Sequence, residues 1–220
     1  YRLTSETITD ALNSNYSASY QYDWVGNRIS SLIDGIATTY SYDDNDRLET
    51  QGGTTYGYDN NGNQTSQLDN GEATEYHYDG KNKLIGLQKN GFEVASYTYN
   101  HNGIRTGKTE NGQATTFVVD SNRDYAQVLL ETDGISQIHY SYGHDLIQQT
   151  RGSQASFYLY DGLGSTRALA DNTGAVTDRY DYEAFGESLN QTGSTENSYL
   201  YTGEQFDQTD GRVRFWHREM

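Results

Sequence analysis

β-Branched and aromatic residues recur with a period of two along much of the chain, as in Ala37–Tyr42. This period predicts β-strands. A cluster of Asn, Asp and Gly follows each such stretch, for example Asp43–Asp46, and these residue types favour a reversal of the chain. A second strand then returns, as in Lys83–Leu87, and a second turn, as at Asn90-Gly91, begins the next unit. No stretch of ten residues has a convincing helical period, so each unit is expected to be a β-hairpin with a link to the next hairpin.

The unit recurs about every 20 residues, in the range of stacked repeat architectures. A Tyr-X-Tyr pair marks each repeat, and the pairs hold 18 of the 21 tyrosines. The pairs are Tyr20/Tyr22, Tyr40/Tyr42, Tyr56/Tyr58, Tyr76/Tyr78, Tyr97/Tyr99, Tyr140/Tyr142, Tyr158/Tyr160, Tyr180/Tyr182 and Tyr199/Tyr201. An aspartate follows several of them directly, at Asp23, Asp43, Asp59, Asp79 and Asp161. A degenerate unit, Phe117–Asp120, fills the gap after Tyr99. We expect all these residues to be structural.

The two tyrosines of a pair should point to the same side, because residues i and i+2 share one face of a strand. Neighbouring hairpins then place the pairs beside one another as cross-strand aromatic ladders. Nine or ten units give roughly twenty strands, too many for a flat open sheet, so the sheet should coil or curl. The predicted fold class is all-β, with tandem β-hairpins in one long antiparallel spiralling sheet that forms a shell or barrel.

Charge and composition exclude several classes of function. The chain has 15 Lys and Arg against 31 Asp and Glu, for a formal net charge of −16. Nucleic acid and anionic membrane surfaces repel such a chain, so neither is expected as a partner. No apolar stretch approaches the roughly 18 residues of a membrane span, so we expect no membrane insertion. The absence of Cys excludes disulfides and thiol catalysis. The chain begins without an initiator Met or a signal-peptide pattern, so it is expected to be a piece of a longer polypeptide.

The repeats resemble a known family. Tyr20–Arg28 and Tyr40–Leu48 look like the YD repeat of RHS (rearrangement hotspot) proteins, teneurins and the C components of bacterial Tc toxins. Tyr158–Leu169 resembles the start of the RHS-associated core, and Tyr180–Glu187 and Tyr201–Asp207 continue that core in order. The resemblance covers essentially the whole chain.

This resemblance divides the chain into a YD-repeat hairpin array, residues 1–150, and an RHS-associated core region, residues 151–220. It implies a long β-ribbon that spirals into a hollow shell, with tyrosines packed between strands. In bacterial members the shell encloses a variable C-terminal toxin, and the core closes one end.

We therefore expect a non-enzymatic structural module of a secreted or cell-surface protein. It would enclose or present a toxin or effector, with the rest of the shell and that cargo as its partners. No cofactor is expected.

Asp207 is the one weak catalytic candidate. In several members of the family the core cuts the chain with aspartates near its end, and Asp207 stands in the matching position. The family's second aspartate is missing, because Asp210–Met220 replaces the usual Tyr-Tyr-Asp-Pro stretch. Asp210 is close in sequence and Glu219 lies in an unrelated frame. We therefore expect Asp207 to be a turn residue, with a remnant aspartyl self-cleavage module as an alternative.

Two further segments of the core carry predictions. Gly162, Gly164, Ser165 and Arg167 are expected to form an enlarged hairpin turn specific to the RHS core. Leu189–Ser198 lacks the strand period and is predicted to be a flexible loop.

Other chemistry is weighed on the same residues. Aromatic faces bind sugars, so a carbohydrate-binding adhesin formed by the tyrosine ladders is an alternative function, with glycans as partners. The acidic turns lack the distal bidentate Glu of a calcium loop, and the five histidines have no ligand spacing, so no metal site is expected. Thr106–Thr109 ends like a phosphate-binding loop, but no helix follows it, and a return strand is expected there.

Overall fold

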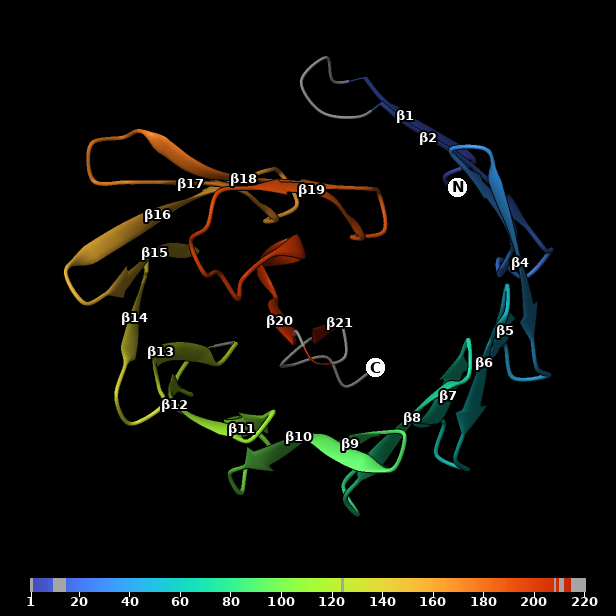
Figure 1. Cartoon of the computed structure of the whole chain (residues 1–220), viewed down its shortest axis with the longest axis horizontal. Helices are drawn as coiled ribbons and strands as arrows, with labels where there is room; N and C mark the ends of the chain where they lie inside the picture. Colours follow the sequence, from blue (N-terminus) through green and yellow to red (C-terminus); the bar gives the residue numbers. More distant parts are fainter. Residues whose placement is uncertain (1, 10–14, 124, 208, 210–211, 215–220) are drawn as a thin grey trace. The chain divides into compact units, whose positions relative to one another are not determined.

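The computed structural model describes residues 2–9, 15–123, 125–207, 209 and 212–214. The chain divides into two compact units, Tyr1–Glu93 and Val94–Met220, which are called unit 1 and unit 2. Each unit is an antiparallel sheet of successive hairpins (Figure 1). The predicted division at residue 150 rests on motifs and stays a prediction.

Unit 1 consists of strands that each pair antiparallel with the next in the chain. Its strands are β1 (Ser5–Ile8), β2 (Tyr16–Tyr22), β3 (Arg28–Ile33), β4 (Ile36–Tyr42), β5 (Leu48–Gln51), β6 (Thr54–Tyr58), β7 (Gln64–Asp69), β8 (Glu72–Tyr78) and β9 (Leu84–Lys89).

Unit 2 repeats the same arrangement and adds a short C-terminal hairpin. Its strands are β10 (Phe92–Tyr99), which begins just before the unit boundary, β11 (Arg105–Glu110), β12 (Gln113–Asp120), β13 (Gln127–Thr132), β14 (Gln137–Tyr142), β15 (Leu146–Arg151), β16 (Gln154–Tyr160), β17 (Thr166–Ala170), β18 (Val176–Tyr182), β19 (Ser188–Thr192), β20 (Gln205–Asp207) and β21 (Arg212–Arg214). The all-β fold of tandem antiparallel hairpins is confirmed. The one helical segment among the described residues is the 3-10 turn η1 (Tyr201–Gly203).

A β-bulge recurs immediately before the second tyrosine of the pair. In β4 the register shifts between Ser41 and Tyr42, so that Tyr40 faces Gln51 and Tyr42 faces Leu48. The same shift occurs in β2, β6, β8, β10, β14, β16 and β18. The degenerate unit keeps it too, between Val118 and Val119. Bulges increase the local twist of a strand, so this repeated bulge adds twist in every hairpin.

The links between hairpins are tight two-residue turns. Asn70 and Gly71 have φ values of 47° and 87°, and Asn90 and Gly91 have 50° and 80°. Two successive residues at positive φ are typical of the type I′ turn, which matches the twist of the flanking strands. The sequence prediction of turns at these Asn-Gly pairs is confirmed.

Each unit has a core on the tyrosine-bearing face of its own sheet. In unit 1 a buried cluster contains Tyr16, Ala18 and Tyr20. In unit 2 the larger cluster is made of side chains from β12 to β18 together with Tyr199. The nine buried members are Phe117, Val128, Tyr140, Leu146, Tyr158, Leu169, Tyr180, Tyr182 and Tyr199.

The last predicted tyrosine pair is wrong as a strand motif. Tyr199 makes only an isolated bridge with Gln205, and Tyr201 lies in η1. The predicted flexible loop Leu189–Ser198 is also wrong in part, because its first residues belong to β19, which pairs with β18. Its remaining residues form hydrogen bonds to the sheet of unit 2, described below.

Candidate functional site

Where an aspartate directly follows a tyrosine pair, it holds the adjacent turn. In the turn after β6 the Asp59 N–H donates to the Asn63 carbonyl, and the Asp59 carboxylate accepts from the N–H groups of Asn61 and Asn63, both at 2.9 Å. Asp43, Asp79 and Asp161 make the same pair of backbone contacts, and Glu183 and Asn100 replace aspartate after a tyrosine pair without losing them. Asp171, which follows β17 and no tyrosine pair, makes them too. The Asn63 side chain and these N–H groups hold the pKa of Asp59 below its usual value.

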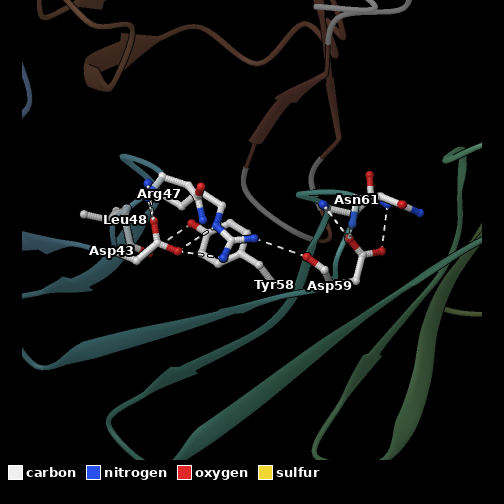
Figure 2. A network of polar contacts seen from close by, with 8 residues as sticks. Asp43, Arg47, Leu48, Tyr58, Asp59 and Asn61 are labelled. Atoms are coloured by element: carbon white, nitrogen blue, oxygen red, sulfur yellow. Dashed lines mark hydrogen bonds and ion pairs between the residues drawn. The ribbon is translucent and has the colours of Figure 1, made fainter.

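Neighbouring turns are tied together by an arginine (Figure 2). The Arg47 guanidinium donates to the Asp43 carboxylate at 2.7 Å and to the Asp59 carbonyl at 3.2 Å. Its Cζ lies 5.0 Å from the centroid of the Tyr58 ring. The hydrogen bond and the charge of Arg47 lower the pKa of Asp43.

The second tyrosines form a ladder of hydroxyl-to-carbonyl hydrogen bonds. Tyr58 donates to the Leu48 carbonyl at 2.9 Å, and Leu48 is the residue opposite Tyr42 in the preceding hairpin. Tyr78 likewise donates to the carbonyl of Gln64, the residue opposite Tyr58. Tyr42 and Tyr160 follow the same rule. Each of these four second tyrosines therefore joins two successive repeats.

The first tyrosines form a second ladder, in which their hydroxyls form hydrogen bonds with polar side chains. Tyr56 donates to Gln51 and Tyr76 to Gln67, each at 3.3 Å. In both cases the acceptor stands opposite the first tyrosine of the preceding hairpin. In unit 2, Tyr140 donates to Glu131 at 3.0 Å by the same rule. This geometry supports a packing role for the ladders.

Residues 193–207 of unit 2 cross the tyrosine-bearing face of the sheet, and we call them the covering segment. Thr195 donates its N–H to Asp178 at 2.8 Å, and Tyr158 donates its hydroxyl to Asn197 at 2.9 Å. The Tyr199 ring packs edge-on against Tyr140, with centroids 5.0 Å apart. Figure 1 shows η1 and β20 inside the curve of β11–β19. The face is therefore covered by the protein's own chain.

A buried cluster of charges fastens the end of the covering segment. Asp207 is fully buried (0% exposed), and both of its oxygens accept from Arg105, at 2.9 and 3.2 Å. Lys108 lies 3.8 Å from Asp207 and forms an ion pair with Glu110 at 2.5 Å. Thr209 donates to Glu110 at 2.8 Å. We call these five residues the charge cluster.

Arg105 is itself almost fully buried. Burial disfavours its charge, but the Asp207 carboxylate and hydrogen bond outweigh that effect and place the pKa of Arg105 above its ordinary value. The guanidinium also lies over the Tyr97 ring, 4.3 Å from its centroid. Asp207 and Arg105 thus form a buried ion pair between residues 102 positions apart in the chain.

A second buried carboxylate, Glu131, stands beside this cluster. It accepts from the Tyr140 hydroxyl and from the Gln205 amide, each at 3.0 Å. Burial raises the pKa of Glu131, and these two hydrogen bonds oppose the shift. Strand β20 is therefore fixed at both ends, by Glu131 through Gln205 and by Arg105 through Asp207.

The prediction that Asp207 lies in a turn is wrong. Asp207 ends strand β20 and is buried, because Arg105 supplies a counter-charge that the sequence separation conceals. Aspartyl catalysis needs two carboxylates that share a proton. Both oxygens of Asp207 instead face a guanidinium. The other two acids considered, Asp210 and Glu219, lie outside the described residues.

The core turn is less unusual than predicted. Gly162, Gly164 and Ser165 form a turn closed by the same aspartate contacts as the turn at Asp59, so it is not enlarged. Its special feature is Ser165, which is buried and accepts from the Thr202 N–H at 3.0 Å. Arg167 lies outside the turn, on β17, and donates to a carboxylate on β18 at 2.7 Å.

Sequence reasoning did not identify Arg105, Glu131 or Gln205. The one signal available was a charge at a strand position opposite a tyrosine or its equivalent, where several other repeats carry uncharged residues such as Gln51, Gln67 and Leu87. Among the described residues, no group of three or more acidic or histidine side chains is arranged to hold a metal ion. No helix of the described part is long and apolar enough to cross a membrane.

Comparison with known proteins gives three findings. The family described as Teneurin YD-shell matches residues 3–218. The tRNA3(Ser)-specific nuclease WapA of Bacillus spizizenii and the tRNA nuclease WapA of Bacillus subtilis are each 33% identical over 95 residues, which is 40% of this chain. The chain spans only 4% of the length of these relatives.

Among solved structures, the alignment with the TcdB2-TccC3 complex covers 94% of this chain and 16% of the chain in that structure, at 15% identity and a TM-score of 0.46. The alignment with the Tc holotoxin pore of Photorhabdus luminescens covers 88% of this chain and 14% of the chain in that structure, at 16% identity and a TM-score of 0.45.

Proposed function

The chain belongs to the teneurin YD-shell family. We therefore propose that it is a non-enzymatic part of a shell wall that encloses or presents a variable C-terminal toxin or effector. The whole protein would be secreted or held at a cell surface, like other proteins that deliver toxins. The partners of this module would be further YD repeats and the cargo.

The observation that carries the proposal is the covering segment. Asp207 and Gln205 fix β20 on the tyrosine-bearing face of unit 2. Any polypeptide that continues beyond the β20–β21 hairpin therefore starts from that face. A cargo attached there would begin its path inside the curve of the sheet, not on the opposite side.

The tyrosine ladders support a structural role for the wall. The hydroxyls of tyrosines such as Tyr58 and Tyr76 form hydrogen bonds between successive repeats. These two hydroxyls are therefore engaged within the sheet, which supports packing as the role of the ladders. The ion pair of Asp207 with Arg105 likewise supports anchoring rather than self-cleavage.

Protease protection of a cargo tests the proposal. A small, protease-sensitive reporter domain is fused after Met220, and its digestion is compared with that of the free reporter mixed with the unfused protein. We expect the fused reporter to be digested about tenfold more slowly, because cleavage follows the population of the opened state. The Asp207→Asn variant is the matched control, and it should reduce the protection. Equal digestion of fused and free reporter would exclude enclosure by this chain.

A further inference from the structure

A cavity of about 150 Å³ lies in unit 2 between the start of strand β13 and the end of the covering segment. Its walls are residues 125–128, Tyr142, Tyr199 and residues 203–205. Val128 and Tyr199 are buried, and burial raises the pKa of Tyr142 to about 12, so much of the wall is shielded from water. An apolar cavity of roughly 150 Å³ binds benzene. The walls therefore suit an aromatic side chain.

One wall residue, Gln205, carries a hydrogen-bond acceptor that is not used. Its Nε2 atom donates to Glu131 at 3.0 Å, which fixes the orientation of the side-chain amide. The Oε1 atom, on the other side of that amide, is buried and has no hydrogen-bond partner among the described residues. A buried acceptor without a partner is costly. An occupant that carries a hydrogen-bond donor would remove this cost.

The register of the C-terminal hairpin directs the chain along the cavity. Gln205 of β20 pairs with Arg214, the last residue of β21, in antiparallel register. Glu204 is still extended, with φ −86° and ψ 153°, so the geometry of β20 persists for one more residue. A ladder continued in this register would place residue 215 opposite Glu204 and residue 216 opposite Gly203. Glu204 and Gly203 are both walls of the cavity.

The two positions fall on different faces of the hairpin. The Gln205 side chain contacts Glu131, so its face is directed at the sheet. Cross-strand partners share a face, and successive residues of a strand alternate between faces. Position 216 therefore falls on the sheet-facing side, and position 215 on the other side. Residue 216 is tryptophan, which combines a large apolar ring with one N–H donor and no acceptor.

We propose that the indole ring of Trp216 occupies this cavity and donates its Nε1–H to the Oε1 atom of Gln205. The ring fills the space beside Gly203, which has no side chain of its own. Trp216 thereby fastens the chain to unit 2 at a point two residues beyond the end of β21. The proposal uses residues of unit 2 alone, so it does not depend on the enclosure of a cargo.

Other occupants fit the cavity less well. Phe215 falls on the opposite face of the hairpin and has no donor for Gln205. A small aromatic molecule from solution meets the same walls, but it lacks the connection through β21 that holds Trp216 beside them. Such a connection gives the attached ring a high effective concentration at the cavity.

Tryptophan fluorescence tests the proposal, because the chain has only two tryptophans. The variant Trp24→Phe leaves Trp216 as the single emitter, and the matched control Trp216→Phe leaves Trp24, which is fully exposed. We expect Trp216 to emit at a shorter wavelength than Trp24. Acrylamide should quench Trp216 about threefold less than Trp24, because a closely packed ring excludes the quencher.

A cavity-filling variant tests the location of the ring. Val128 is a buried wall residue, so Val128→Phe in the Trp24→Phe background should fill the cavity and displace the indole. The emission and quenching of Trp216 should then approach those of Trp24. The control is Val118→Phe, at a half-exposed position of β12, and it should leave Trp216 unchanged. Circular dichroism checks that both variants stay folded.

Binding of free indole supplies a measurement that does not depend on Val128→Phe. Calorimetry compares the wild type with Trp216→Ala, in which the cavity should be open to the probe. We expect Trp216→Ala to bind indole with a Kd below about 1 mM, and the wild type to bind it at least about tenfold more weakly. The control Phe215→Ala should bind indole as weakly as the wild type.

Three results would overturn the proposal. The first is equal quenching of Trp216 and Trp24, and the second is an unchanged emission of Trp216 in a folded Val128→Phe variant. The third is equal affinity of the wild type and Trp216→Ala for indole. That result would show that the cavity is not filled by the ring of Trp216.

Discussion

Neutralising Asp207 should detach the covering segment of unit 2. In Asp207→Asn the side chain keeps its shape but loses its charge, and Arg105 remains buried without a counter-charge. The Asp207 Oδ2 to Arg105 Nη1 distance is 2.9 Å, which corresponds to an attraction of roughly 6 kcal/mol at an effective dielectric constant of about 20. Desolvation of both groups offsets much of this attraction. Breaking one side of a buried pair nevertheless costs about 3–5 kcal/mol, because the remaining charge stays desolvated.

The cost should appear first as local opening, because the side chains of β20 bind the sheet through Arg105 and Glu131. Hydrogen exchange followed by mass spectrometry should show faster exchange over residues 193–207 in Asp207→Asn, while β11–β18 stay protected. Urea unfolding gives the accompanying loss of free energy. The double variant Asp207→Asn/Arg105→Gln should recover part of the loss, because it removes the orphaned charge.

The matched control is Glu196→Gln, which breaks the exposed ion pair with Arg151. The Glu196 side chain is 80% exposed, so its loss should cost less than about 1 kcal/mol. If Asp207→Asn costs no more than Glu196→Gln, and exchange over the covering segment is unchanged, then the charge cluster does not anchor this segment.

Three further predictions concern the repeat. Tyr76→Ala should cost about 3–5 kcal/mol in urea unfolding, because the ring is 4% exposed, whereas Tyr78→Phe should cost about 1 kcal/mol for its lost hydrogen bond; equal midpoints for Tyr76→Ala and wild type would contradict packing by the ladder. Asp59→Asn should make the free energy of unfolding fall less steeply than in the wild type as the pH is lowered into the acid range. A lowered folded pKa adds stability above the unfolded pKa, and this stability is lost as the pH falls through the folded value; an unchanged acid limb would contradict the turn argument. The raised pKa of Glu131 in the folded protein adds stability at low pH, and the wild type loses this stability as the pH rises through that pKa. In Glu131→Gln the free energy of unfolding should therefore fall less between pH 5 and pH 8 than it does in the wild type. Parallel pH curves for variant and wild type would show that Glu131 does not titrate differently on folding.

The sequence was sufficient for the hairpins because their determinants are local. Asp59 and Asn63 are four residues apart, and Asn70 and Gly71 are adjacent, so composition and spacing determine these turns. The prediction for Asp207 failed because its environment depends on a partner 102 positions away. Position in a Gly- and Asp-rich stretch indicated a turn, whereas the charge of Arg105 makes burial on a strand possible. The same limit applied to Tyr199, whose ring packs on Tyr140 outside any hairpin.

At Glu196 and Asn197 the covering segment meets the place where the first-tyrosine ladder changes partners. By the rule of the other repeats, Tyr158 would donate to Gln149, the residue opposite Tyr140. Instead Tyr158 donates to Asn197, and the Gln149 amide donates to the carbonyl of Glu196 at 2.9 Å. The Tyr158 hydroxyl and the Gln149 amide thus donate to the covering segment and not to the sheet. A buried polar group without a partner is costly, so the Tyr158 hydroxyl needs either Gln149 or this segment. The Gln149 Oε1 atom, which would accept from Tyr158, is left without a hydrogen-bond partner among the described residues. Docking of residues 193–207 therefore exchanges one internal bond of the ladder for two bonds to the segment. This exchange of hydrogen bonds explains how the covering segment can bind across the tyrosine-bearing face of a sheet whose other repeats contact one another directly.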